Sequence, residues 1–204
     1  DDAAGLAISS RMTSQINGLN QAVRNANDAI SMVQTADGAL IEVTNMLQRM
    51  RELAVQGASG TNTGTNDMAA INTEYEALRD EVFQIVDDTQ WNGATLLDGN
   101  VAAAGDQTVD FHVGANASQT VTIDFGDFET GSFGTFTAAH DIDAAGEANT
   151  AIGIIDTALT TVNSKRAVFG AAINRLEHTA DNLANVSQNT SASRSRILDA
   201  DYAS

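Results

Sequence analysis

The histidines are the side chains of this sequence that could most readily bind a metal ion or move a proton near neutral pH. His112, His140 and His178 lie in three different segments, without the spacing that metal ligands need. His178 falls on a predicted helix with no second histidine four residues later, which excludes the zinc motif HExxH. The chain has no cysteine, so thiol catalysis and thiolate metal sites are excluded as well.

Two acidic pairs, Asp87 with Asp88 and Asp141 with Asp143, could bind a divalent cation weakly. Neither pair has the glycine or the terminal glutamate of a calcium-binding loop, so a solvated surface is the favoured interpretation. No phosphate-binding glycine motif and no nucleophile motif occurs in the sequence. We therefore predict that the protein is not an enzyme and has no metal site and no cofactor. The enzyme alternative would need an acidic metal site within residues 98–143.

The segment LQRMRELAVQ, residues 47–56, has a more specific pattern. Arg49 and Arg51 lie on one turn of a predicted helix, Glu52 follows them, and Leu53 is a candidate for an exposed leucine. An ordinary solvated helix surface explains this pattern, because Arg49 and Glu52 can form a weak pair at i, i+3. From these residues alone, the ordinary interpretation is favoured over a binding site.

Long helices must position these residues, because both ends of the chain have apolar stripes with steps of three and four. Sustained over many turns, such steps are typical of a coiled-coil seam, in which each helix buries its stripe against a partner. No proline interrupts either stripe. We expect the two end helices to pair in antiparallel directions, with a middle helix completing the bundle. The stripes are Ile16, Leu19, Val23, Ala26, Ile30, Val33, Leu40 and Leu47 at the front, and Ile152, Ile155, Leu159, Val162, Phe169, Ile173, Leu176, Ala180, Leu183 and Ile197 at the back.

The first helix is expected to run from the first few residues to about Gln56. Its weak point is Asp37-Gly38, because a helical glycine costs about 1 kcal/mol relative to alanine and an unpaired buried carboxylate costs more. A loop over 57–66 separates it from a second helix that is capped by Asn66 or Asp67 and ends near Thr89. The last helix is expected from about residues 144–147 to about Asp199.

The middle of the chain changes character. Apolar and polar residues alternate over 109–113 and again over 121–125, with the turn GANAS between them, which predicts a β-hairpin. Phe128, Phe133 and Phe136 lie in glycine-rich sequence that could form a second short hairpin. The predicted fold is mainly α with a small β region: a coiled-coil-like bundle of three helices plus hairpins. Residues 1–90 and 147–204 jointly form the predicted helical rod, and 91–146 an exposed region.

The charge of the chain narrows the classes of partner. Ten basic and 27 acidic residues give a net charge of −17, which argues against nucleic acid or an anionic membrane surface, since both attract basic patches. No basic residue lies between Asp80 and Ser164, where the acidic residues number fourteen. This distribution predicts a stem that carries the basic residues and an acidic, exposed middle.

The motifs together closely resemble bacterial flagellin, the subunit of the flagellar filament. The resemblance runs through DDAAGLAIS, NQAVRNANDAISMVQTADGAL, LQRMRELAVQ, WNGATLLDG, FHVGANASQT and the C-terminal stretch from VNSKRAVFGAAINRLEHTADNLANVSQ to LDADYA. It covers nearly all of the chain except residues 126–145. It implies the outer-tube helical domain of a flagellin truncated at both termini, without the terminal helices of the inner core. Such a truncated chain is expected to fold but to remain a monomer.

The resemblance also implies the partners of the protein and its location. The implied partners are other flagellin subunits and the flagellar export and cap machinery. The implied location is extracellular, in the filament, after export without a cleaved signal peptide. Monomeric flagellin is a ligand of Toll-like receptor 5, and motif by motif the receptor contact is implied to be Arg49, Leu53 and Glu74, flanked by Gln48 and Gln56. We further expect stem arginines to meet acidic groups of neighbouring subunits: Arg11, Arg24, Arg49, Arg51 and Arg175. The alternative is a hook–filament junction protein, which shares the terminal helical pattern.

Overall fold

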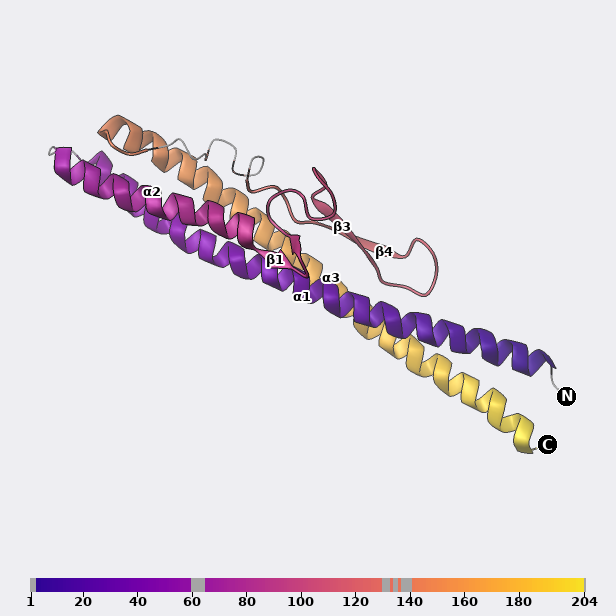
Figure 1. The fold of residues 1–204 in the computed structure, drawn as a ribbon. Coiled ribbons are helices and arrows are strands. Elements are labelled where there is room, and N and C mark those ends of the chain that lie inside the picture. Colours follow the sequence, from indigo (N-terminus) through magenta and orange to yellow (C-terminus); the bar gives the residue numbers. More distant parts are fainter. Residues whose placement is uncertain (1–2, 60–64, 130–132, 134–135, 137–140, 204) are drawn as a thin grey trace. The chain divides into compact units, whose positions relative to one another are not determined.

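Three long helices dominate the computed structural model, which describes residues 3–59, 65–129, 133, 136 and 141–203 (Figure 1). They are α1 (Ala3–Ala58), α2 (Thr65–Asp88) and α3 (Ala145–Ala203). The strands are β1 (Gln90–Trp91), β2 (Ala94–Thr95), β3 (Thr108–His112) and β4 (Thr120–Asp124), arranged as two separate two-stranded sheets, β1-β2 and β3-β4. The predicted fold class is confirmed, and each predicted helix agrees with the structure to within a few residues.

The chain divides into two compact units, and both contain parts of α1 and of α3. Unit 1 comprises Asp1–Val33, Asp110–Ile123 and Ala171–Ser204, and unit 2 comprises Gln34–Val109 and Asp124–Gly170. The predicted rod of 1–90 with 147–204 is a different division of the chain, and it stays a prediction.

In unit 1, α1 and α3 pair in antiparallel directions. Asn20 on α1 accepts a hydrogen bond from Ser187 Oγ at 2.8 Å, and Thr13, further back on α1, accepts one from Arg194, further on in α3, at 3.1 Å. The buried cluster of this unit contains Leu19, Ala22 and Leu183, with Val23 and Ala115 packed against it. Ala115 belongs to the turn between β3 and β4, so the hairpin end contributes to this core.

A glycine of α1, Gly18, allows the hairpin turn to pack closely on the helix. A Cβ placed on Gly18 would lie 3.4 Å from the Cβ of Ala115, so the hairpin turn approaches the α1 backbone almost directly. About two turns further along α1, Asn25 Nδ2 donates to the carbonyl oxygen of His112 at 2.8 Å. Side-chain contact and hydrogen bond together fix the end of the hairpin on the helix.

In unit 2, all three helices pack around an apolar core. The fully buried residues include Leu40, Leu47 and Met50 from α1, Tyr75 from α2 and Val162 from α3. Most of the predicted stripe positions are therefore buried as expected. The antiparallel pairing of the end helices continues here, because the ion pairs that join α1 to α3 are Asp37 with Arg166 and Arg51 with Asp156.

Asp37 avoids the free-energy penalty of an unpaired buried carboxylate, because it has an ion-pair partner. Its Oδ1 accepts a hydrogen bond from Arg166 Nε at 2.8 Å, and both side chains keep roughly a third of their surface exposed (28% and 31%). A Cβ at the neighbouring Gly38 would meet no atom within 4 Å, so packing does not demand a glycine there. The helix continues through this point because the carboxylate has a partner on α3.

Within unit 2, the segment that follows β4 packs on the helices through phenylalanine. Phe128, Phe133 and Phe136 are buried and their rings form a cluster with Phe83 of α2, at centroid distances of 5.2 to 6.3 Å. Phe125, directly after β4, packs on Phe169 of α3 at 5.6 Å. The second short hairpin expected around these phenylalanines falls largely outside the described residues.

Candidate interaction surface

Arg49 joins α1 to α2 at the surface of unit 2. Its Nη2 lies 2.8 Å from Glu74 Oε1 on α2, and its Nη1 lies 3.0 Å from Glu52 Oε2 one turn along α1. The predicted pair of Arg49 with Glu52 is therefore confirmed. The structure also brings together Arg49 and Glu74, which the sequence places 25 residues apart. Hydrogen bonds from the guanidinium to Glu52 and Glu74 raise the pKa of Arg49.

About half of this ionic cluster remains open to solvent. The side chains of Arg49 and Glu74 are each 48% exposed, and Glu52 is 69% exposed. Gln48 and Gln56, on the same stretch of α1, are exposed too. Four of the five residues predicted for receptor contact thus share one accessible surface.

Leu53 is the exception, and the expectation that it points outward is wrong. Its side chain is only 2% exposed. Arg49 pairs with α2 and Arg51 pairs with α3, and these two positions point about 200° apart around the helix axis. Because α1 contacts a helix on either side, it buries a wide arc. Leu53 falls inside that arc, on the side of α2.

The arginines expected to face neighbouring subunits differ in whether a carboxylate of the same chain neutralises them. Arg51 Nε lies 2.6 Å from Asp156 Oδ1 on α3, so its charge is already paired within the chain. Arg24 donates from Nε and Nη2 to Gln21 Oε1, at 3.1 and 2.6 Å, and so has a neutral partner. Arg11 and Arg175 are exposed, and within the described part of the chain neither forms an ion pair.

A buried arginine on α2 was not predicted. The side chain of Arg79 is 9% exposed, and it pairs with Asp80 and with Asp141 of the segment before α3, at 3.0 Å each. Next to that pair, Ile142 N donates to Asn72 Oδ1 at 2.7 Å, and Ile142 is fully buried. Arg79 and Asn72 therefore fasten the segment before α3 to α2. The available signal was the position of Arg79 in the apolar stripe, four residues after Tyr75.

Metal-holding groups of side chains and membrane-spanning helices are both absent from the described residues. Among them, no group of three or more histidine, cysteine or acidic side chains is arranged to hold a metal ion. None of the described helices has both the length and the apolar character needed to cross a bilayer.

Known proteins match both ends of the chain. Residues 1–102 match the family model described as the bacterial flagellin N-terminal helical region, and residues 152–204 match the bacterial flagellin C-terminal helical region. The flagellin of Halalkalibacterium halodurans is 48% identical over 203 residues, which is 100% of this chain and 72% of that protein. The flagellar filament core protein flaB2 of Brachyspira hyodysenteriae is 42% identical over 211 residues, 100% of this chain and 74% of that protein.

Solved structures agree with these matches. The crystal structure of Bacillus cereus flagellin superposes with a TM-score of 0.69 at 35% identity, covering 78% of this chain and 88% of that one. A putative flagellar hook-associated protein from Vibrio parahaemolyticus has a TM-score of 0.78, covering 96% and 98%, but only 15% identity, so it shows a shared fold alone. From the two family regions and the full-length similarity to a flagellin, this chain belongs to the bacterial flagellin family.

Proposed function

We propose that the protein is a structural subunit of the flagellar filament and serves motility. The observation that carries this proposal is the match of both terminal helical regions to flagellin, supported by a relative named as a filament core protein. Subunits would associate through unlike surfaces, so that the contacts do not close into a ring and copies add along a helical tube. Its place would be outside the cell, after export without a cleaved signal peptide by the flagellar export and cap machinery.

A genetic test separates this function from the alternative. The complete gene that contains the coding sequence of this chain is introduced into a bacterium that lacks its own flagellin, and the cells are examined by electron microscopy and for swimming. Long filaments and restored motility are expected. A hook–filament junction protein shares the fold but would leave the cells without long filaments, and that result would replace the filament function by the junction function.

The same surface supports a second proposed role, as a ligand of Toll-like receptor 5. The resemblance to recognised flagellins indicates the residues, and the geometry supports four of them: Gln48, Arg49, Gln56 and Glu74 are accessible and lie on adjacent parts of α1 and α2. Arginine with a polar rim is a common anchor of protein interfaces. Leu53 is buried and is left out of the proposed contact.

Two arginines of α1 provide a matched pair for the test. Arg49→Ala should weaken receptor binding by about 30-fold, the loss typical of an interface anchor. Arg51→Ala removes the same kind of side chain from the opposite side of α1 and should leave the affinity unchanged. Binding of monomer to the receptor ectodomain is measured directly. Equal affinities of the two variants would remove Arg49 from the contact. Assembled filaments should bind less than monomer, because subunit contacts would cover this surface.

A further inference from the structure

The two units differ in how their positive charges are neutralised. Unit 2 has five basic residues, and every one of them forms an ion pair with a carboxylate of the same unit: Arg49, Arg51, Arg79, Lys165 and Arg166. Unit 1 also has five basic residues, and among the described side chains none of them pairs with a carboxylate: Arg11, Arg24, Arg175, Arg194 and Arg196.

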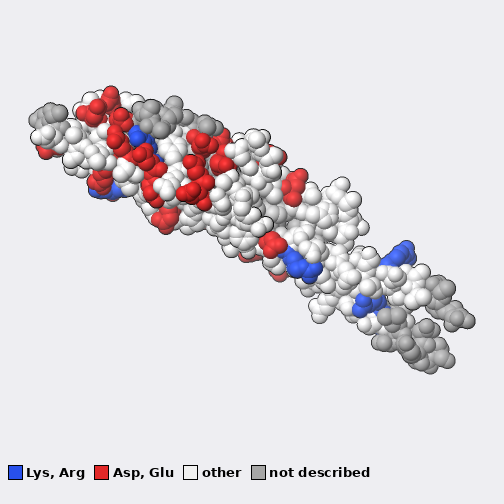
Figure 2. All heavy atoms as spheres, viewed as in Figure 1, with Lys and Arg blue, Asp and Glu red and all other residues white. Residues whose placement is uncertain are grey.

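This difference is notable because carboxylates are abundant, with 27 in the chain. Asp28 even lies one helical turn after Arg24, yet the guanidinium of Arg24 turns back to Gln21. On the face seen in Figure 2, most of the coloured side chains of unit 2 are acidic. Among the described residues, unit 1 therefore offers cations without a carboxylate partner, and unit 2 offers an excess of anions.

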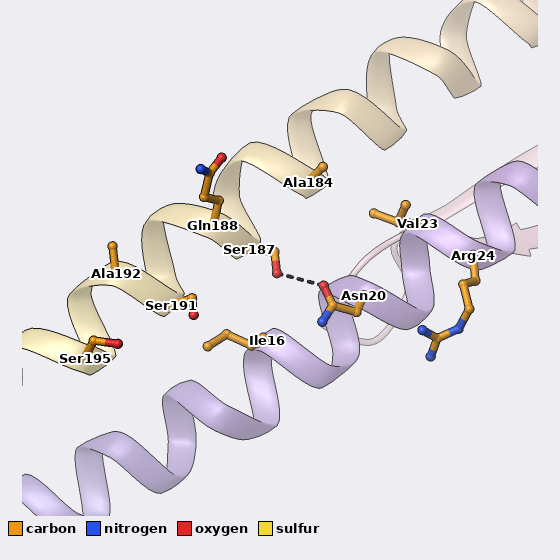
Figure 3. A pocket seen from close by; sticks show the side chains of 10 residues that line it. All are labelled: Ile16, Asn20, Val23, Arg24, Ala184, Ser187, Gln188, Ser191, Ala192 and Ser195. Atoms are coloured by element: carbon orange, nitrogen blue, oxygen red, sulfur yellow. Dashed lines mark hydrogen bonds between the residues drawn. The ribbon is translucent and has the colours of Figure 1, made fainter. Parts of the chain in front are cut away.

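A groove in unit 1 lies beside one of these cations. It has a volume of about 660 Å³ and is bordered by Ile16, Val23 and Arg24 on α1 (Figure 3). The facing residues of α3 are mostly small, including Ala184, Ser191 and Ala192. After Leu183, the next buried residue of α3 is Ser187, which forms a hydrogen bond with Asn20 at 2.8 Å instead of filling space with an apolar side chain. Small side chains leave a groove that a second helix can approach closely.

Arg24 is held in place at the edge of this groove. Its guanidinium donates to Gln21, the amide of Gln21 donates to Asn25 at 2.8 Å, and Asn25 donates to the carbonyl of His112 at 2.8 Å. This chain of hydrogen bonds connects Arg24 to the hairpin and orients a cation that has no carboxylate partner among the described residues. A positioned guanidinium of this kind is well suited to a bidentate or charge-assisted bond with an incoming carboxylate.

The outer surface of α2 has the complementary composition. Asp67, Glu74, Glu81 and Asp88 are exposed and recur every seven residues, so they follow one line along the helix. The exposed alanines Ala70 and Ala77 lie beside this line, and no exposed basic residue occurs on α2. A helix that presents alanine and carboxylates can enter a groove of small residues. It can bring the charges of Asp67, Glu81 and Asp88 to arginines at the edge, whereas Glu74 is already paired with Arg49.

We propose that the groove between α1 and α3 in unit 1 binds the outer surface of α2 from a second copy of this chain. The contact joins two different surfaces, so each copy can bind one neighbour through its groove and another through its α2, which propagates a polymer. The inference rests on the proposed filament function and names the two surfaces that carry part of the assembly.

Chemical cross-linking tests the contact. Because the chain has no native cysteine, only the introduced cysteines can react. Filaments of the double variant Ser191→Cys with Ala77→Cys are treated with a short bismaleimide, which tolerates small differences in register. A ladder of covalent multimers is expected, and neither single variant should give one. The matched control pairs Ser191→Cys with Thr157→Cys, an exposed residue of unit 2 on α3, and should stay monomeric.

The outcomes separate the two proposals. Filaments that give no ladder, or equal ladders for both pairs, would overturn the groove contact and leave the filament function intact. Absence of filaments even from the unsubstituted gene would end the filament function. The same two cysteine pairs would then be compared in a concentrated solution of purified protein, where a selective Ser191–Ala77 cross-link supports the contact and equal yields reject it.

Charge reversal gives an independent measurement. Arg24→Glu should raise the protein concentration needed for assembly roughly tenfold, because like charges then face each other at the groove. Combining Arg24→Glu with Glu81→Arg restores opposite charges on the two surfaces and should recover most of the loss. Assembly of the Arg24→Glu variant at the original concentration would contradict the proposal, as would a double variant that is no better than the single one.

Discussion

Replacing Leu53 by alanine distinguishes a buried leucine from the exposed one that the sequence pattern suggested. The substitution removes three carbon atoms from a side chain that is 2% exposed, in the interior between α1 and its neighbours. At about 0.8 kcal/mol for each buried carbon, the transfer contribution is about 2.4 kcal/mol. The residual cavity adds to this, so a total loss of about 3 kcal/mol in the free energy of unfolding is expected, within the range of buried leucine-to-alanine changes.

The same helix provides the control. Val55 lies two residues further on and is 49% exposed, so Val55→Ala should change the free energy of unfolding by less than about 0.5 kcal/mol. For a chain of this length, a loss of 3 kcal/mol corresponds to a decrease in Tm of about 6–12 °C. The two variants therefore differ by an effect that is easily resolved.

Urea unfolding followed by the fluorescence of Trp91 is the appropriate assay. Trp91 is the single tryptophan of the chain and lies in unit 2, as Leu53 does, so the signal reports the unit that carries the substitution. A midpoint for Leu53→Ala as close to that of the parent protein as the midpoint for Val55→Ala would refute the burial of Leu53. It would also return that residue to the proposed receptor contact.

Three further substitutions test polar groups of unit 2. Burial raises the pKa of Tyr75 to about 12 from 10.0, and its hydroxyl is buried without a hydrogen-bond partner in the described structure. Since a raised pKa gives stability that is present below the unfolded value and lost as pH rises towards the folded value, Tyr75→Phe should cost little at neutral pH and should reduce the loss of stability between pH 10 and 12 in alkaline unfolding curves. Burial alone would raise the pKa of Asp98, but hydrogen bonds from Thr95 and Asn100 outweigh it and lower the pKa. Asp98→Asn should therefore be destabilising near pH 7, and the difference in urea midpoint should shrink as pH falls below about 4; a difference independent of pH would contradict this sign. Arg166→Gln leaves the half-buried Asp37 unpaired and should cost about 1–2 kcal/mol in thermal unfolding, a prediction that an unchanged Tm would exclude.

The helices could be predicted from the sequence because the stripe of apolar residues is long and nothing interrupts it. The hairpin β3–β4 was equally clear, since its strands alternate between apolar and polar residues. The small sheet of β1 and β2 was missed, although Asn92-Gly93 is the turn that favours it. Both residues have positive φ, 50° and 83°, as a two-residue hairpin turn of this kind requires. Residues 89–93 were interpreted only as the end of the second helix.

Side-chain exposure was harder to predict than secondary structure. Leu53 is on the edge of the apolar stripe, and its burial depends on α2 and α3 contacting α1 from both sides, which is tertiary information. Arg79 is buried for a related reason: its partner Asp141 is 62 residues away in the chain. The family resemblance placed Arg49 and Glu74 in one receptor contact, but it did not predict their ion pair. The pairing of Asp37 with Arg166 had no local signal either.

The pairing of Asn20 with Ser187 and of Thr13 with Arg194 has a consequence for the order of folding. These contacts join positions 167 and 181 residues apart, and the segments of unit 2 lie in between. Bringing such distant positions together costs loop-closure entropy, and that cost falls when the intervening chain is already compact. Unit 2 can therefore form first and shorten the path. During synthesis, the first half of α1 lacks its α3 partner until the last part of α3 has left the ribosome.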